Sequence, residues 1–273
     1  MKQRKRTIVF TLAGLFIALL HLVPFYILLT VSFKDMRDIS SKWIFPGYLF
    51  TDNFVSAWHK AELGRAFMNT AFITFLSVSL IIILGSLAAF PLARYQTRTN
   101  KWMYGFFVSA LIVPPLTILV PLYKMFVNLG FMNTYFGVVL LHVTFHLAMS
   151  IFLYTSFIGT IPKELDEASM IDGASKIGMF FRIILPLLKP VTATIIIMNA
   201  NSIWNDYQFS VFFLQKPESK TITVALSTFF GENSVQIGWV AAGALMAAIP
   251  SIIIYIFLQR YFVEGITSGA IKG

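Results

Sequence analysis

The sequence predicts an all-α integral membrane protein with six transmembrane helices. Of its 273 residues, 57% are hydrophobic and 12% are charged, and the mean hydropathy is +0.76. Soluble domains contain about 25% charged residues. A helix needs about 20 apolar residues to cross about 30 Å of hydrocarbon. Six stretches are long enough, at about residues 8–32, 67–93, 103–125, 134–158, 184–209 and 236–262.

The distribution of basic residues explains the net charge of +9. They cluster before the first apolar run and between the second and third, at Lys2, Arg4, Lys5, Arg6, Arg94, Arg98 and Lys101. Cytoplasmic loops of membrane proteins carry an excess of Lys and Arg. With six spans, this pattern places both termini and the segment 159–183 in the cytoplasm, and it argues against nucleic-acid binding. Because the chain contains no cysteine, disulfides and thiolate chemistry are excluded.

The first apolar run is expected to be a retained helix, because it is too long for a signal peptide and no cleavage motif follows it. The loop after it, roughly 33–66, lies outside in this topology and holds Trp43, Pro46, Trp58 and His59. We expect this outer loop either to cap the helix bundle or to dock an extracytoplasmic partner.

The third span contains Pro114, Pro115 and Pro121. Proline removes a backbone donor and clashes with the preceding turn, so the helix should be kinked or broken there. Broken helices in membranes often line a cavity, but proline also serves packing alone, and both interpretations stay open.

A charged segment lies between the fourth and fifth spans and contains Lys163, Glu164, Asp166, Glu167 and Asp172. Burying these side chains in lipid is costly, so the segment is expected to lie in water. A helix in water with a partly apolar face usually docks onto another surface. The sequence therefore predicts a docking segment here.

Within this segment we expect a helix to begin at Thr160–Pro162, with Thr160 as the cap and Pro162 in the first turn. Its small and apolar stripe would comprise Ile161, Leu165, Ala168 and Ser169. Gly173 allows the chain to turn. A second short helix with Ile177, Phe180, Phe181 and Ile184 would return the chain to the membrane, where Pro186 opens the fifth span.

The spacing of these residues resembles the E-A-A-x3-G-x9-I-x-L-P motif of the membrane subunits of bacterial binding-protein-dependent ABC importers. Ser169 stands where that family more often has alanine, and the other motif positions match. In that family the segment forms coupling helices that lie in a groove of the nucleotide-binding subunit. The resemblance therefore implies an ATPase-coupling role for Glu167, Ala168, Ser169, Asp172, Gly173, Ile183, Leu185 and Pro186.

Other segments resemble the carbohydrate-uptake branch, of the kind seen in the second permease of maltose-type systems. They are Ser32-Phe33-Lys34, Asn69-Thr70, Trp204-Asn205-Asp206-Tyr207 and the ending Thr267–Gly273. The resemblance implies the type I ABC importer transmembrane fold, with coupling helices between the fourth and fifth spans. It divides the chain into residues 1–66 (first helix and outer loop), a core domain 67–262, and a cytoplasmic tail 263–273.

The same resemblance implies a permease subunit in the bacterial cytoplasmic membrane that translocates a carbohydrate. Its partners would be a second homologous permease, two ATPase subunits and an extracytoplasmic sugar-binding protein. The chain contains no G-x-x-x-x-G-K-[ST] phosphate loop. We therefore expect it to bind no cofactor and to catalyse no reaction, with ATP and Mg²⁺ held by the partner ATPase.

The fifth span is the most polar, and its candidate substrate-pathway residues are Asn199, Asn201, Trp204, Asn205 and Asp206. Amides and carboxylates bond sugar hydroxyls, and an indole covers a pyranose face. The alternative is that these residues cap the outer helix end and bond neighbouring helices. His142 and His146 share one face of the fourth span. We expect packing or interhelical hydrogen bonding there, rather than a pathway role or a metal site, because no carboxylate or cysteine accompanies them.

Two other classes of function compete with the importer. A self-sufficient secondary transporter or channel should show buried carboxylates or an inverted repeat, and Asp206 is the only acid in a predicted span. An intramembrane enzyme needs a nucleophile–base pair or a metal site, and the sequence offers neither.

Overall fold

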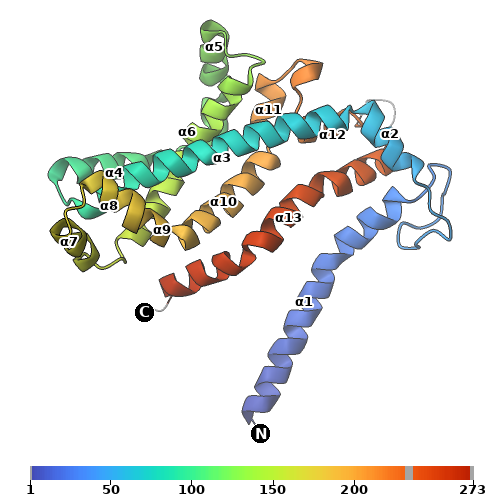
Figure 1. The fold of residues 1–273 in the computed structure, drawn as a ribbon. Coiled ribbons are helices and arrows are strands. Elements are labelled where there is room, and N and C mark those ends of the chain that lie inside the picture. Colours follow the sequence, from blue (N-terminus) through green and yellow to red (C-terminus); the bar gives the residue numbers. More distant parts are fainter. Residues whose placement is uncertain (1, 231–235, 271–273) are drawn as a thin grey trace. The chain divides into compact units, whose positions relative to one another are not determined.

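The computed structural model of the chain describes residues 2–230 and 236–270, and the regular elements there are helices. They are α1 (Lys2–Ser32), α2 (Asp52–Lys60), α3 (Leu63–Arg94), α4 (Arg98–Ala110), α5 (Leu119–Leu129), α6 (Tyr135–Ile158), α7 (Glu164–Ile171), α8 (Lys176–Met179), α9 (Leu185–Leu187), α10 (Lys189–Trp204), α11 (Gln208–Phe213), α12 (Ile222–Ser227) and α13 (Ile237–Ala270) (Figure 1).

The helices confirm the predicted membrane spans. Four are long and apolar enough to cross a bilayer: α1 from Arg6, α3, α6, and α13 up to Gln259. Two bent pairs meet the same criterion together. One joins α4 to the segment Pro115–Leu129 across a bend of 88°, and the other joins Lys176–Leu187 to α10 across a bend of 71°. Counting each bent pair as one span gives six.

The break in the third span has the predicted cause. Pro114 is extended, with φ −68° and ψ 129°, and a short 3₁₀ turn follows at Pro115–Ile118. Two consecutive prolines remove two backbone donors and push the preceding residue out of helical geometry. Pro121 causes no second break, because it lies in the first turn of α5, where its missing N–H has no partner in any helix.

The described chain forms two compact units, Met1–Ala66 with Ile222–Ile249, and Phe67–Thr221 with Pro250–Gly273. One division between the two units falls after Ala66. The segment Ile222–Ile249 groups with the first unit. The division into residues 1–66, 67–262 and 263–273 stays a prediction. In addition, α13 continues to Ala270, so the expected tail 263–273 is largely helical, and its last residues, 271–273, lie outside the described residues.

Two glycines of α13 explain why its first half joins the first unit. A Cβ built on Gly238 would lie 2.8 Å from the side chain of Asn53, and one built on Gly243 would overlap Leu226. The helix therefore packs so closely here that a larger residue at either position would displace Asn53 or Leu226. Trp239 adds an edge-to-face contact with Phe229, with ring centroids 5.6 Å apart. Hydropathy alone does not reveal such contacts.

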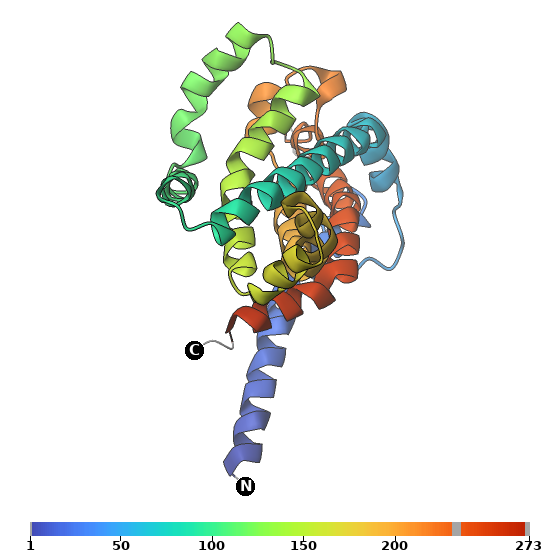
Figure 2. The ribbon, with the colours of Figure 1, turned by 60° about the vertical axis from the view of Figure 1, so that its left-hand side comes forward.

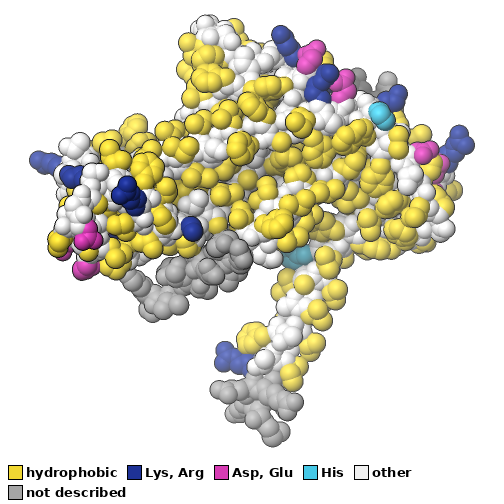
Figure 3. Space-filling model, in the orientation of Figure 1, with side chains coloured by type: hydrophobic (Ala, Val, Ile, Leu, Met, Phe, Trp, Pro, Cys, Tyr) yellow, Lys and Arg dark blue, Asp and Glu magenta, His cyan; other side chains and the backbone are white. Residues whose placement is uncertain are grey.

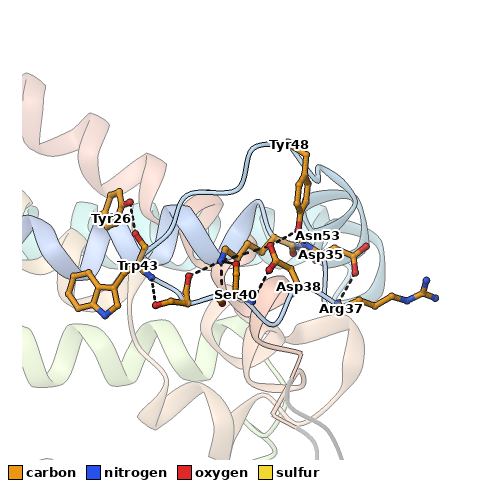
Figure 4. A network of polar contacts seen from close by, with 10 residues as sticks. Tyr26, Asp35, Arg37, Asp38, Ser40, Trp43, Tyr48 and Asn53 are labelled. Atoms are coloured by element: carbon orange, nitrogen blue, oxygen red, sulfur yellow. Dashed lines mark hydrogen bonds and ion pairs between the residues drawn. The ribbon is translucent and has the colours of Figure 1, made fainter.

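The loop between α1 and α2 is organised by polar contacts that involve Asp38, Ser40 and Asn53 (Figure 4). At their centre is the buried side chain of Lys34. The ammonium donates to the carbonyls of Ser40 and Ser41 at 3.3 and 2.8 Å and also bonds the Ser40 hydroxyl. Asn53 donates to the carbonyls of Ser32 and Lys34 at 3.0 and 2.7 Å, which fastens α2 to the end of α1. Within the first unit the outer loop is thus an ordered structure.

The second unit has the larger apolar core, formed chiefly by α3, α5, α6, α10 and α11. Its fully buried large side chains include Ile81, Phe126, Tyr154, Ile195 and Phe213. Hydrophobic side chains also cover much of the outer face along α3 (Figure 3), as expected for a surface in contact with lipid or another subunit. This core fixes the positions of the short helices described next.

Candidate functional site

The motif segment forms a short helix pair, α7 and α8, at one end of the second unit (Figures 1 and 2). Charged side chains gather on this end in Figure 3. Between the helices, Gly173 has φ +80°, Gly173 N donates to the Met170 carbonyl at 3.1 Å, and Ala174 N donates to Ser169 at 2.9 Å. This is a Schellman C-cap, which requires a left-handed residue and so favours glycine. The predicted turn is confirmed.

The start of α7 differs from the prediction. The helix begins at Glu164, and its N-cap residue, Lys163, makes no side-chain cap bond. The Thr160 hydroxyl donates instead to the carbonyl of Phe157, at 2.7 Å, which ends the preceding helix. Thr160 therefore serves the C-terminus of α6, and the acidic first turn of α7 compensates its unpaired amides through the helix dipole.

The buried stripe of α7 is also not the predicted one. Ile161 and Ser169 are buried as expected, but Leu165 and Ala168 are exposed and Asp166 is buried. The helix turns its polar Asp166–Ser169 face inward because Asp166 pairs with the buried Arg94 there.

Arg94, the last residue of α3, joins this segment to the membrane helix. Its guanidinium donates to the carbonyls of Ile158 and Ile161 at 3.2 and 2.9 Å and pairs with the Asp166 carboxylate at 2.8 Å. Only 4% of the Arg94 side chain and 12% of the Asp166 side chain are exposed. We name this set of contacts the Arg94 clamp.

Sequence reasoning used Arg94 only as a topological charge and so missed the clamp. An arginine in the last turn of a span, together with acids in a later loop at the same end of the bundle, is the sequence signal for such a pair. The fold of that loop determines which acid the arginine reaches.

The outward surface of the pair is apolar with a charged edge. Met170, Ile171 and Ile177 are 50%, 86% and 72% exposed, and Glu167 and Asp172 lie exposed beside them. Isolated apolar side chains on a surface are ordinary, but several on one short helix pair are typical of a docking site. Ser169 shows no such exposure, and its hydroxyl bonds the Asp166 carbonyl at 2.8 Å.

The second half of the motif carries the chain back to the membrane. Ser175 caps α8 through a bond from the Gly178 amide, and a π-helical turn follows at Phe180–Ile184. Phe180 and Ile184 are buried, whereas Pro186 is exposed in α9. The fifth span then bends at Leu188 and does not begin straight from Pro186.

The five candidate pathway residues do not come together at one place. Asn199 is buried and donates to the Ser150 hydroxyl on α6 at 3.2 Å. Asn205 is exposed and donates to Asn201, whose side chain also lines a small groove beside α13. Trp204 is buried, with its ring 5.9 Å from that of Phe67. Their pathway role stays a prediction.

Asp206 has two surroundings. It caps α11, accepting bonds from the amides of Phe209 and Ser210 at 3.1 and 2.9 Å. Its carboxylate also lies 3.8 Å from the imidazole of His142. His146 bonds the His142 carbonyl and Ser202, which lies across on α10. In the described part of the chain no group of three metal-binding side chains is close enough to hold an ion.

These features define a class of protein. The chain is a bundle of apolar spans that holds a short, exposed helix pair at one end. This arrangement is typical of a membrane subunit that is driven by another polypeptide. Comparisons with known proteins support this class. A family model described as the binding-protein-dependent transport system inner membrane component matches residues 81–268. The chain belongs to this family, and the predicted resemblance is confirmed.

Two relatives and one solved structure show which members of this family the chain is similar to. The melibiose/raffinose/stachyose import permease MelC of Bacillus subtilis is 50% identical over 266 residues, which cover 97% of this chain and 96% of the relative. AmyC of Thermoanaerobacterium thermosulfurigenes, a probable permease for starch degradation products, is 34% identical and covers 96% of both chains.

The solved structure shares the fold. It is a chain of a bacterial ABC transporter involved in the import of the acidic polysaccharide alginate, with a TM-score of 0.84, 22% identity, and coverage of 96% and 98% of the two chains. The chain is thus a multi-pass permease subunit of the carbohydrate-uptake branch of ABC importers, and not the ATPase or any other enzyme of the complex.

Proposed function

We propose that this chain is one of two homologous permease subunits of an ATP-driven importer for oligosaccharides of the melibiose and raffinose kind. The observation that carries the cargo class is the 50% identity to a melibiose/raffinose/stachyose permease over nearly the whole of both chains. In this proposal the complex lies in the bacterial cytoplasmic membrane, with both termini of this chain in the cytoplasm.

The energy enters through α7 and α8. The exposed apolar side chains Met170 and Ile171 would pack into a groove of the ATPase, and Glu167 would bond a basic group there. ATP and Mg²⁺ would be held by that ATPase and not by this chain. When two ATPase subunits close on ATP, they would carry the helix pair with them.

The Arg94 clamp determines where this motion goes. Because Arg94 ends α3 and also bonds the carbonyls of Ile158 and Ile161, α7 is tied directly to two membrane helices, α3 and α6. The π-helical turn and α9 lead in sequence to α10. Movement of α7 would therefore reach three spans, and these would alternate between outward and inward access.

The extracytoplasmic sugar-binding protein would dock on the outer loop, whose ordered polar contacts around Lys34 keep its shape fixed. The hinge between α8 and α10 would be formed by the coupling-segment residues Ile183, Leu185 and Pro186. In this proposal they do not contact the ATPase.

The first test is affinity purification of the chain from its native membrane in mild detergent, followed by mass spectrometry. The importer proposal expects a second permease and a phosphate-loop ATPase in the sample. A single species that transports in liposomes without ATP would point to a self-sufficient secondary transporter or channel.

The second test is Gly173→Asp, which should abolish ATP-linked uptake while membrane insertion stays intact. A side chain at φ +80° costs about 1–2 kcal/mol and brings a carboxylate onto the docking surface. Gly130→Asp is the matched control, because Gly130 also has positive φ and open space around it, but ends α5. Normal uptake by the Gly173 variant would remove the coupling assignment.

A further inference from the structure

A cavity of about 310 Å³ opens in the second unit where the third span is broken. One wall comes from the break itself, with Leu111 and Val113, and the opposite wall comes from α6 and from the junction of α10 with α11. Its polar lining residues are His142, His146, Ser202, Asp206 and Gln208. Within the described chain, the lining residues come from the broken span, from α6, and from α10 and α11 with their junction.

The hydrogen bonds of His146 fix its tautomer. Its Nδ1 is 2.8 Å from the His142 carbonyl, which can only accept, so Nδ1 carries a proton. In the neutral ring Nε2 then accepts from the Ser202 hydroxyl, 3.1 Å away on α10. This contact joins α6 to α10, so His146 has a structural role.

His142 has no such partner. The residue is 1% exposed, and neither ring nitrogen makes a hydrogen bond within the described chain. Its Nε2 lies 3.8 Å from the Asp206 carboxylate, which is too far for a hydrogen bond. A buried polar side chain without a partner is unfavourable. The His142 ring forms part of the cavity wall, and both of its nitrogens are covered in this structure.

The rest of the lining suits a sugar. The rings of Phe145 and Phe209 are stacked, with centroids 5.0 Å apart and an angle of 24°, and both lie on the cavity. Aromatic and apolar walls with a few placed polar groups are typical of small-molecule sites, which span about 300–1,000 Å³. This cavity is at the lower end of that range, so it has room for one sugar ring and not for a whole oligosaccharide.

We propose that this cavity holds one ring of the oligosaccharide during translocation, with His142 as its specificity-determining hydrogen-bond partner. A sugar hydroxyl both donates and accepts, so it can bond Nε2 of His142 once the imidazole turns toward the cavity, and it can also face the Asp206 carboxylate. The C–H face of the sugar ring then packs against the aromatic pair of Phe145 and Phe209. The inference rests on the proposed carbohydrate importer, and it locates the contact at the broken span and not at Asn199 or Asn201.

The experiment uses the purified complex of this chain with its partner permease and ATPase, without the binding protein, and tritiated raffinose as the probe. Wild type should retain the label. His142→Phe, which keeps a planar aromatic ring and removes both nitrogens, should weaken raffinose binding about tenfold or more. Val113→Trp, on the opposite and exposed wall, should fill the cavity and reduce binding at least as much.

The matched control is His21→Phe on α1, because His21 is exposed and bonds only the Ile17 carbonyl of its own helix. A second readout is the ATP hydrolysis that the loaded binding protein stimulates in proteoliposomes. The proposal expects both cavity variants to hydrolyse ATP within about twofold of wild type while they import less raffinose per ATP. A merely structural role for His142 would lower assembly, hydrolysis and uptake together.

Equal raffinose binding by the wild-type and Val113→Trp complexes would overturn the inference. If the His142→Phe complex fails to assemble, the Val113→Trp complex alone tests whether the cavity binds the sugar. A wild-type complex that imports raffinose but retains no label would overturn it as well and leave the importer standing. If wild type neither binds nor imports raffinose or melibiose, the proposed function fails and this inference fails with it.

Discussion

The Arg94 clamp and the network around Lys34 both bury a basic side chain in a loop junction, but they do so differently. Arg94 pairs with a carboxylate at 2.8 Å and bonds two carbonyls, with almost no exposure of either partner. Lys34 bonds mainly neutral oxygens, and the nearest carboxylate, that of Asp38, lies 3.9 Å away.

The difference agrees with the proposed roles of the two junctions. A planar guanidinium directs its donors at fixed angles and so holds its partners in one geometry, whereas an ammonium is a point charge that accepts several arrangements. A lever that transmits force needs the first kind of contact. A loop that only keeps its shape for docking is served by the second, and it tolerates small rearrangements.

The largest effect should follow from Arg94→Ala. It leaves Asp166 buried without its partner, and breaking a buried pair costs about 3–5 kcal/mol. We expect a lower melting temperature of the purified complex and a several-fold rise in ATP hydrolysed per imported sugar, because α7 is no longer tied to α3. The measurement is thermal unfolding together with the ratio of ATP to sugar in proteoliposomes.

The double variant Arg94→Met, Asp166→Leu separates stability from coupling. Replacing both charges by apolar groups should recover most of the lost stability, because no unpaired charge stays buried. Coupling should stay impaired, since the directional bonds to Ile158 and Ile161 are gone. Wild-type coupling in either variant would mean that the clamp is not part of the lever.

Much of the fold could be predicted from the sequence because the bilayer imposes strong rules. The length of each apolar run, the Pro114-Pro115 break and the glycine turn at residue 173 each follow from one local cause. The charged segment was likewise predicted to lie outside the lipid, and the structure exposes Ile171 and Ile177 there; its docking role stays a prediction.

The contacts that join distant segments could not be predicted. Whether α7 turns Leu165 or Asp166 inward depends on Arg94, which is 72 residues away in the chain. The cavity likewise requires α6, α10 and the broken span together, so its polar lining was seen only as separate residues. His142 gave no sign in the sequence that its nitrogens would lack partners.

Lys34→Met should have a smaller effect than Arg94→Ala. It removes donors to the carbonyls of Ser40 and Ser41, and hydrogen bonds to charged groups contribute about 1.5–3 kcal/mol. Much of this loss can be recovered, because neighbouring loop residues are exposed and water can replace the ammonium. We expect faster amide hydrogen exchange in residues 35–50 with unchanged melting of the complex. Unchanged exchange would show that Lys34 does not hold the loop.

The smallest effect should come from Tyr48→Phe. Hydrogen bonds from the Ser40 hydroxyl, the Tyr48 hydroxyl and the Ser40 amide lower the pKa of Asp38 from 3.8 to about 2. Because this pKa is depressed in the folded loop, the stabilisation it represents is present above about pH 3.8 and is lost as the pH falls toward 2.

Removing one of these donors should raise the pKa of Asp38 part of the way back to 3.8. The pH range over which the loop loses this stabilisation then becomes narrower. Uptake at neutral pH should not change. The carboxyl ¹³C shift of Asp38, titrated in nanodiscs and assigned with Asp38→Asn, measures it. The same bond raises the pKa of the Tyr48 phenol, so the wild-type tyrosine should titrate later than usual at alkaline pH. An Asp38 pKa that stays near 2 in the variant would show that the bonds from Ser40 are sufficient to lower it, and the contrast with the Arg94 clamp would then rest on Lys34 and Ser40.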